Sequence, residues 1–362
     1  MSNTSNPNAT KETMTSPTSP TTPSTPDARM NPTPVWRPSA SAAGSLLLLG
    51  AALTGCGAEG TGSLTVLLEA EDVITSGIEA GDGPENIRDG WTVTFDRYIA
   101  AVGALDIHRA SNEDVDVDAP EVFVVDVAQV PATGLALFQL DGLRAGRWEF
   151  NYTTPAADEG ATRHASVSQA DYDDMVANGW TYLIDGTLRN PSGQSCPPVA
   201  LATPGAAVPN GNVSGTSPCY DATEVRFVVG AAADTHYGPC EVDEVPGFAV
   251  TSGGSTTVAM TLHGDHIFFN GFPESTEGGV TRLAQWLADC DLNLDGTVTA
   301  EELQAIAPSQ LAELDERFQL GGSPITPLDT MSMYAYFRAQ LKTQGHFQGE
   351  GECPVDGVGH VH

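Results

Sequence analysis

Short runs of branched and aromatic residues, separated by turns rich in glycine and proline, are the feature that most constrains how this chain can fold. Such runs favour β-strands, because branched and aromatic side chains pack well on a pleated sheet. The connections between them, such as Asp141-Gly142, suit reversals of chain direction. The runs occupy residues 63–69, 91–101, 122–127, 135–140, 147–153, 180–188, 224–229 and 256–262.

We therefore expect a mainly β protein whose body is an antiparallel β-sandwich. The composition agrees, because 38 Gly and 25 Pro residues with only 17% charged residues favour turns and strands over long surface helices. One short helix is expected from Gln169 to Asn178, ending at Gly179. No repeat of fixed period stands out, which argues against a propeller or a solenoid.

The charge balance is strongly acidic, with 47 Asp and Glu residues against 15 Lys and Arg residues and a formal net charge of -32. Nucleic acid is therefore excluded as a partner, because a polyanion needs a basic surface to bind. Excess acid on a surface chiefly keeps it hydrated and resists association, and a part of it can attract divalent cations.

The N-terminal region reads as an export signal. Residues 2–35 are largely Ser, Thr, Pro and Asn, so they cannot form a core and we expect them to be disordered. The apolar run at residues 45–53 follows Arg37, is too short to span a bilayer, and is typical of a signal-peptide core. It ends in Leu-Thr-Gly-Cys at residues 53–56, which resembles the lipobox of bacterial lipoproteins.

The lipobox resemblance implies cleavage after Gly55 and a lipid on Cys56 that anchors the chain to a bilayer. Gly57 follows the cysteine where Asp would indicate inner-membrane retention, so we expect the outer membrane or the cell surface, with the periplasmic face also open. A signal core that starts this late suggests translation from Met30, which gives a signal of ordinary length.

These observations divide the chain into five expected segments. They are residues 1–29, disordered or ahead of the true start; 30–55, the signal peptide; 56–275, a β-rich domain; 276–345, a helical region around the acid-rich residues 291–302; and 346–362, a C-terminal tail.

Six cysteines are present, and export to an oxidising compartment permits disulfides. Lipidation of Cys56 leaves five of them, which allow at most two bridges. We predict a bridge from Cys196 to Cys219, which closes a loop rich in Gly, Pro and Asn, and a bridge from Cys290 to Cys353. Cys240 is then the unpaired cysteine.

Residues 291–302 read Asp-Leu-Asn-Leu-Asp-Gly-Thr-Val-Thr-Ala-Glu-Glu and resemble the calcium-binding loop of EF-hand proteins. A hard cation such as calcium takes roughly six to eight oxygen ligands, which alternate residues of a tight loop can supply. Gly296 stands where the loop needs a positive φ, and Val298 is the apolar residue expected in a short β pairing. The resemblance implies ligands at Asp291, Asn293, Asp295, Thr297, Thr299 and Glu302.

Helices are expected on both sides of this loop, from Val280 to Ala288 and from Ala300 to Ala307. EF-hands usually occur in pairs, and no second loop with the pattern is found, since residues 315–329 have the wrong spacing. A single loop in an exported protein favours a structural calcium site over a cytosolic type of sensor.

Histidines gather late in the chain, and His263, Asp265, His266 and His346 form a second candidate site, for zinc, copper or iron. Residues three apart on a strand face opposite sides, so His263 and His266 can converge only if Gly264 bends the chain. The alternative is that these are ordinary surface histidines and a frayed tail.

The sequence leaves three functions open. The first is an exported, lipid-anchored calcium-binding protein with a structural or ligand-binding role. The second is a periplasmic or surface protein that binds a transition metal, and the third is a secreted hydrolase. We expect no enzyme, because the nucleophile elbow, the zinc-protease helix and the phosphate and dinucleotide glycine loops are all missing from the sequence.

Overall fold

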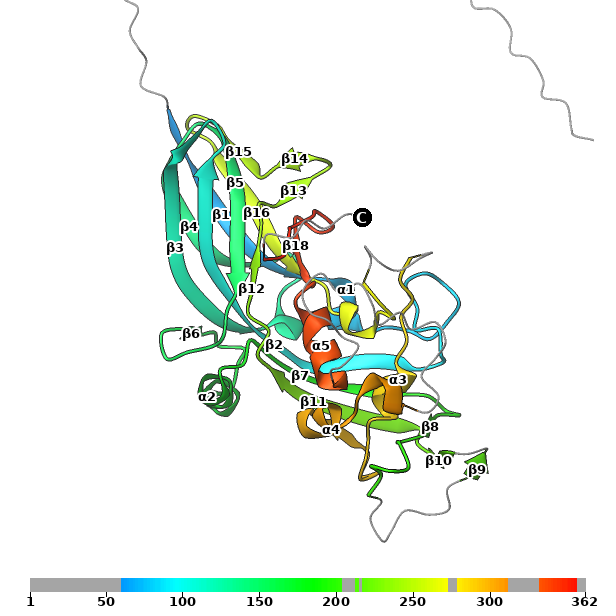
Figure 1. The fold of residues 1–362 in the computed structure, drawn as a ribbon. Helices are drawn as coiled ribbons and strands as arrows, with labels where there is room; N and C mark the ends of the chain where they lie inside the picture. The colour runs from blue at the N-terminus through cyan, green and yellow to red at the C-terminus, as the bar shows by residue number, and fades with distance from the viewer. Residues whose placement is uncertain (1–59, 204–211, 215–216, 273–278, 312–331, 357–362) are drawn as a thin grey trace, which may run out of the picture. The chain divides into compact units, whose positions relative to one another are not determined.

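The computed structural model describes residues 60–203, 212–214, 217–272, 279–311 and 332–356. Residues 57–362 belong to one compact unit, and everything below concerns that unit. Strands hold 45% of the residues and helices 17%, which confirms the expected mainly β class. Figure 1 shows long curved strands at one end of the unit and short helices at the other.

The first sheet contains four strands. Its order is β18 (Gly345–Phe347), β16 (Ser255–Leu262), β1 (Thr61–Ala70) and β4 (Leu135–Arg144). The strands β1 and β16 run parallel, with Ser63 paired to Ser255 and Ala70 paired to Leu262. β18 and β4 are antiparallel to their neighbours.

The second sheet contains nine strands and curls like half of a barrel. Its centre is β2 (Thr92–Arg109), a long strand with two register shifts, at Gly103/Leu105 and His108/Arg109, in its pairing with β3. Bulges of this kind bend a strand and increase its twist, which explains the curvature visible in Figure 1. The other strands are β3 (Asn112–Asp126), β5 (Gly146–Thr154), β6 (Thr162–Arg163), β7 (Tyr182–Arg189), β11 (Glu224–Ala231), β12 (Thr235–Tyr237), β15 (Phe248–Val250) and β17 (Thr297–Thr299).

Short elements fill the remaining positions. The predicted helix is confirmed as α2 (Gln169–Asn178), which begins at the N-cap Ser168 and ends at Gly179 in the left-handed conformation. The others are α1 (Asp72–Ser76), η1 (Val127–Gln129), β8 (Gln194–Ser195), β9 (Asn212–Ser214), β10 (Ser217–Asp221), β13 (Glu241–Val242), β14 (Val245–Pro246), η2 (His266–Phe268), α3 (Gln285–Ala288), α4 (Ala300–Ala305), η3 (Pro308–Gln310) and α5 (Met333–Leu341).

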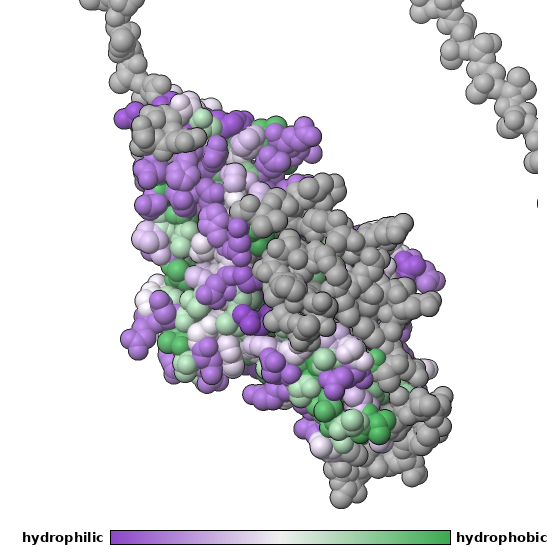
Figure 2. Space-filling model, viewed as in Figure 1, coloured by the Kyte–Doolittle hydropathy of each residue, from purple (hydrophilic) through white to green (hydrophobic). Residues whose placement is uncertain are grey.

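Both sheets contribute to one hydrophobic core. Alternate residues of β1, namely Leu64, Val66 and Leu68, are fully buried, as the two-residue period of a strand requires. Each such side chain stabilises the fold by about 1.5–3 kcal/mol through removal from water. The outside is polar: only Val199 and Val245 are exposed large hydrophobic residues in the described parts, and Figure 2 shows mostly hydrophilic residues over the strands on the visible face.

Three fold predictions need correction. The body is mixed rather than antiparallel, because β1 pairs with β16, β3 with β6 and β11 with β17 in parallel, and it curls as a half-barrel. The expected helix over Val280–Ala288 is reduced to the single turn α3, because Arg282 lies in extended backbone bridged to Ile87 and Phe269. The expected C-terminal tail starts inside β18, so its first residues belong to a sheet.

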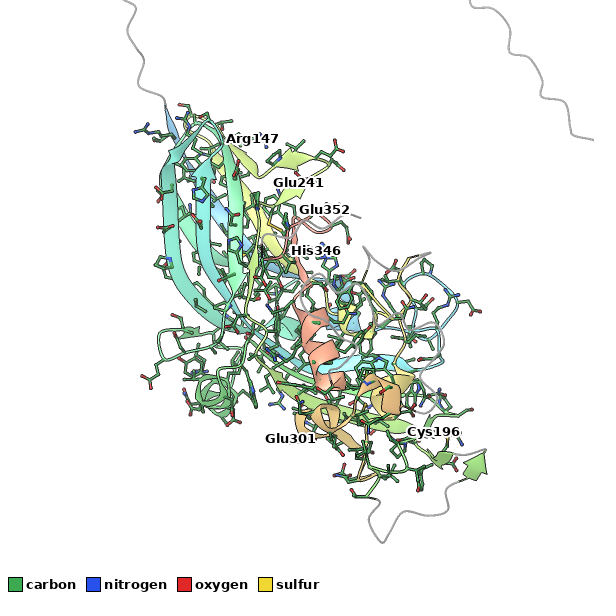
Figure 3. All side chains as sticks on the ribbon, viewed as in Figure 1. Arg147, Cys196, Glu241, Glu301, His346 and Glu352 are labelled. Carbon is green, nitrogen blue, oxygen red and sulfur yellow. A yellow bond between two sulfur atoms is a disulfide. The ribbon has the colours of Figure 1, made fainter. Side chains whose placement is uncertain are left out.

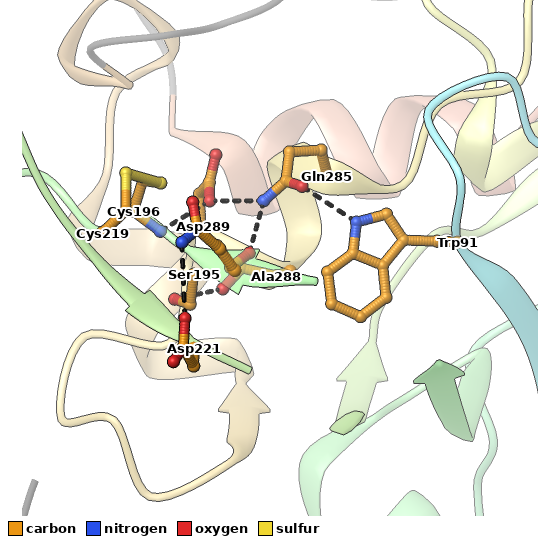
Figure 4. The surroundings of a disulfide bond; sticks show 9 residues. Trp91, Ser195, Cys196, Cys219, Asp221, Gln285, Ala288 and Asp289 are labelled. Atoms are coloured by element: carbon orange, nitrogen blue, oxygen red, sulfur yellow. Dashed lines mark hydrogen bonds between the residues drawn. A yellow bond between two sulfur atoms is a disulfide. The ribbon is translucent and has the colours of Figure 1, made fainter. Parts of the chain in front are cut away.

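The predicted Cys196–Cys219 disulfide is confirmed. Figure 4 shows how its surroundings tie it to α3: the Cys196 N–H donates to Asp289 at 2.7 Å, and the amide of Gln285 donates to the same carboxylate at 2.8 Å. Trp91 in turn donates its indole N–H to Gln285 at 2.9 Å. The bridge therefore holds the strands β8 and β10 against the segment that leads into residues 291–302, the acidic loop.

The second predicted disulfide is wrong, because Cys353 pairs with Cys240, and Cys290 is the free one among the described cysteines. Backbone bridges from Tyr237 to Val355 and from Glu241 to Glu352 align the two segments, which brings the two sulfurs together. Cys290 is instead buried at the end of α3, where its thiol donates to the Trp286 carbonyl at 3.2 Å.

Candidate metal centre

The structure brings His263, His266 and His346 together in the interior. Their candidate ligand nitrogens all lie within 4.8 Å of one another. The three residues are only 5–6% exposed. His263 directly follows β16, His266 begins η2 and His346 is in β18. Figure 3 shows His346 far from Glu301 of α4, which belongs to the acidic loop.

Sheet pairing and one sharp bend explain the convergence. β16 and β18 are antiparallel neighbours, and the His263 N–H donates to the Gln344 carbonyl at 3.0 Å, so His263 and His346 start from adjacent strands. After His263 the chain leaves the sheet at Gly264 and enters η2, which turns His266 back. Gly264 permits this approach, because a Cβ there would lie 2.4 Å from Cγ1 of Ile74.

Hydrogen bonds select one nitrogen on each of two rings. His263 donates Nε2–H to the Gly349 carbonyl at 3.1 Å, which leaves the lone pair on Nδ1. The Thr343 hydroxyl donates to the Gln340 carbonyl, so it accepts Nδ1–H from His266 at 2.8 Å and leaves that lone pair on Nε2. Metal-binding histidines are typically oriented in this way, by a hydrogen bond from the other ring nitrogen.

Two carboxylates adjoin the histidines. Glu71 follows β1 directly, and its backbone N–H donates to the Leu262 carbonyl at 3.0 Å, which places it level with His263. Its Oε2 lies 3.8 Å from Nδ1 of His263. Asp265 is 1% exposed, and it forms with Glu71 and His263 a second group of candidate ligand atoms within 4.8 Å of one another. Sequence reasoning proposed Asp265 but missed Glu71, because only the parallel register of β1 and β16 brings it here.

Arg282 is the positively charged residue next to these carboxylates. Its Nε donates to Oδ2 of Asp265 at 2.6 Å, and a second guanidinium nitrogen donates to Glu85 at 2.6 Å. The guanidinium also lies over the ring of Phe269, 5.3 Å from its centroid, and Phe269 stacks on His266 at 4.5 Å. Arg282 therefore balances the charge of Asp265 and supports the ring of His266.

The two carboxyl groups cannot easily carry separate charges. Burial, and next the negative charge of Asp265, raise the pKa of Glu71 to about 9, although Arg282 acts in the opposite direction. Glu71 Oε2 and Asp265 Oδ1 are buried and receive no N–H hydrogen bond from the described part of the chain. The pair is therefore stabilised by a shared proton or by a cation.

The rings of His263 and His346 are stacked, with centroids 3.9 Å apart and planes inclined by 24°. The lone pair of an imidazole nitrogen lies in the ring plane, so an ion bound by both rings must lie close to both planes. Two stacked rings do not meet this condition. One ring must therefore rotate when both bind the same ion.

The acidic loop predicted to hold calcium is well ordered by its own hydrogen bonds. Asp291 accepts from the N–H of Gly296 at 2.9 Å, and Asn293 accepts from the N–H of Asp295 at 2.7 Å. Glu302 accepts from Leu292 and Asn293 with one oxygen and from Thr299 with the other. Burial, opposed by the Gly296 hydrogen bond and reinforced by the charge of Glu302, raises the pKa of Asp291 to about 6.

The loop is completed by a strand of the large sheet. Gly296 has φ of +85°, as expected, and Val298 is fully buried where it pairs in parallel with Phe227 of β11. Thr297 and Thr299 flank Val298 in β17, and Thr299 caps α4. Flanking helices are one turn (α3) and six residues (α4), so an EF-hand helix–loop–helix is not formed. The loop carboxylates also lie outside the converging groups of possible metal ligands found in the described residues.

Cys56 and the predicted signal peptide lie outside the described residues. None of the helices in the described ranges is long and apolar enough to cross a membrane. A comparison with protein-family models, with curated proteins and with solved structures finds no match to this chain.

Proposed function

We propose that this protein binds a transition-metal ion at His263, His266 and His346, as the second of the three functions left open by the sequence. The observation that supports it is the meeting of three imidazoles from three separate segments in a buried position.

The chemistry of the ligands indicates the class of ion. Imidazole nitrogen suits zinc, copper, iron and nickel, whereas calcium and magnesium prefer oxygen. Cys290 is at the end of α3, and the other described cysteines are in disulfides, so the cluster lacks a thiolate from those residues. We therefore expect zinc, copper or iron rather than a sulfur-ligated centre.

Export remains part of the proposal. Two disulfides support an oxidising compartment, and the lipobox-like sequence ending in Cys56 supports a lipid anchor there. In such a compartment the protein would capture or carry a metal ion rather than turn over a substrate.

Metal analysis of protein made without an affinity tag tests the proposal. Metal-free protein should take up one zinc or copper ion per chain in a calorimetric titration, and His263→Ala, His266→Ala and His346→Ala should each abolish stoichiometric binding. His236→Ala is the matched control, because His236 is exposed on β12. Absence of a stoichiometric ion, or undiminished binding in the three cluster variants, would contradict the proposal.

Calcium binding at the loop of residues 291–302 is a second proposal, with a structural role. Its support is the loop itself: Gly296 at positive φ, Val298 paired with β11, and the acidic side chains folded toward the centre of the loop. A loop joined to β11 does not need the second EF-hand with which such loops usually pair.

Thermal unfolding with and without calcium tests this second proposal. Calcium should raise the melting temperature of the wild type, and Glu302→Gln should remove that calcium-dependent shift. The control is Glu301→Gln, the exposed neighbour on α4. Because Glu302 also completes the capping box of α4, only the difference between the two calcium conditions counts. Equal shifts in both variants would exclude calcium from the loop.

A further inference from the structure

We infer that Glu71 is the fourth ligand of the metal ion, so that the centre has three imidazoles and one carboxylate. This inference rests on the proposed function at the histidine cluster and goes beyond it by assigning the carboxylate and, with it, the charge of the ion. Glu71 was not among the residues that the sequence singled out.

The backbone fixes where Glu71 starts. β1 and β16 are parallel, and their last paired residues are Ala70 and Leu262, so Glu71 and His263 leave the sheet side by side. The carboxyl ends of parallel strands commonly form binding sites for this reason. The hydrogen bond from the Glu71 N–H to the Leu262 carbonyl, at 3.0 Å, extends the pairing by one further residue.

The spacing of the two ligand atoms fits a single ion. Zinc lies about 2.0–2.2 Å from nitrogen and oxygen ligands, so two ligands at a tetrahedral angle are roughly 3.4 Å apart. Oε2 of Glu71 is 3.8 Å from Nδ1 of His263, which is the nitrogen that carries the lone pair. A small adjustment of the side chains brings both atoms to bonding distance.

Charge distinguishes Glu71 from Asp265. Asp265 already has a cation, because Nε of Arg282 donates a hydrogen bond to its Oδ2 and the same guanidinium forms an ion pair with that oxygen. Oε2 of Glu71 is buried and has no hydrogen-bond donor in the described ranges. Asp265 therefore acts as a positioning residue between Arg282 and the centre, and Glu71 is the carboxylate whose charge a metal ion would balance.

The ligand set also selects the charge of the ion. Three neutral imidazoles and one carboxylate, without a described sulfur ligand, suit divalent zinc, copper or iron, whereas monovalent copper prefers thiolate and thioether ligands. Once Glu71 has lost its proton, its buried negative charge further favours a dication. The centre should therefore bind zinc(II) or copper(II) more tightly than copper(I).

Competition titrations of the full chain with zinc(II) test the assignment. Glu71→Gln should weaken zinc binding by at least about 10-fold, which is the lower end of the loss seen even when outer-shell partners are removed. Glu69→Gln is the matched control, since Glu69 is on the same strand outside both converging groups, and its affinity should stay within about 2-fold of wild type. Metal-free Glu71→Gln should unfold at the same or a higher temperature, because the change removes a buried acid.

The outcomes separate the two proposals. Normal zinc binding by Glu71→Gln, with loss in the histidine variants, would overturn the role of Glu71 and leave the histidine centre intact. Loss of zinc affinity in Asp265→Asn but not in Glu71→Gln would assign the carboxylate ligand to Asp265 instead. Binding of two zinc ions per chain would show that the ligands form two centres and not one. Failure of the wild type to bind any ion would defeat the proposed function itself.

X-ray absorption of the zinc-loaded wild type serves where the variant does not fold. The expected first shell contains three imidazole nitrogens and one carboxylate oxygen, recognised by the multiple scattering of the rings. A shell of imidazoles and water without the carboxylate would overturn the inference.

Discussion

At the scale of single residues, Asp185 and Glu71 show two different environments for a carboxyl group in the interior. Asp185 of β7 is 2% exposed and accepts hydrogen bonds from two arginines on neighbouring strands, Arg97 and Arg226. Glu71 differs, because no arginine hydrogen bond to its carboxyl group is described: Asp265 and a histidine nitrogen 3.8 Å away adjoin it, and the charge of Arg282 only partly offsets that of Asp265. This contrast distinguishes a structural ion pair from a candidate ligand.

Acid should unfold the protein partly through Asp185. Burial alone would raise the pKa of Asp185, but hydrogen bonds from Arg226 and Arg97 and their charges lower it below the ordinary value. A folded pKa below the unfolded value of about 3.9 gives stability that is present above that pH and is lost as pH falls through the folded pKa. Asp185→Asn should lower the free energy of unfolding by about 1–3 kcal/mol at neutral pH. Its further loss of stability below about pH 4 should be smaller than that of the wild type.

Urea unfolding of both proteins between neutral pH and strong acid measures this effect. Glu224→Gln is the control, because the Glu224–Arg189 pair is exposed and such pairs contribute about 0–1 kcal/mol. If the wild type and Asp185→Asn lose the same free energy of unfolding as the pH falls, Asp185 does not contribute to stability in acid.

At the scale of elements, the bend between β16 and η2 decides whether the histidines meet. Gly264 lies against Ile74 of α1, where a Cβ would be 2.4 Å from Cγ1 and 3.3 Å from Cδ1 of that side chain. Both atoms disappear in Ile74→Ala, and the next neighbour, Tyr98, is 3.5 Å away, an ordinary contact.

Gly264→Ala should therefore displace η2 and weaken metal binding, by about 10-fold or more if ligand orientation responds as it does to loss of outer-shell partners. Adding Ile74→Ala should restore the affinity, even though the smaller side chain costs about 2–5 kcal/mol of stability. Zinc titrations of the two single variants and the double variant measure this. An affinity that stays low in the double variant would mean that contact with Ile74 is not what shapes the bend.

Element positions were largely predictable from the sequence, and their partners were not. The runs at residues 63–69 and 256–262 became β1 and β16, because branched and apolar residues bounded by turn formers identify a strand. That pattern identifies a strand but not which strand lies alongside it or in what direction. Hence the sequence indicated His263, His266 and His346 but not Glu71, whose place depends on the parallel pairing.

At the scale of the whole molecule, the two disulfides tie down different parts. Cys196–Cys219 spans 23 residues, whereas Cys240–Cys353 spans 113 and fastens the segment that follows β18. That segment includes Gly349, whose carbonyl accepts the Nε2–H of His263. The longer bridge is therefore connected to the histidine cluster.

Removal of each bridge should have different consequences. A chain-entropy model gives losses of roughly 3 kcal/mol for the short loop and roughly 5 kcal/mol for the long one. The double change Cys240→Ser with Cys353→Ser should also reduce zinc affinity, whereas Cys196→Ser with Cys219→Ser should lower the melting temperature only. Calorimetric unfolding and zinc titration of both proteins measure the difference, and equal affinities would show that the C-terminal segment holds its place without the bridge.

The parallel pairing of β1 and β16 also sets the order in which this chain can mature. β4 is synthesised soon after β1 and can pair with one of its edges early. The other edge of β1 stays open until residues 255–262 are made, and the histidine cluster cannot form before His346. Contacts between such distant segments form slowly, and an open strand edge invites pairing with other chains in the meantime. Nascent molecules should therefore depend on chaperone protection, and under the proposed function metal loading should be the last step of their assembly.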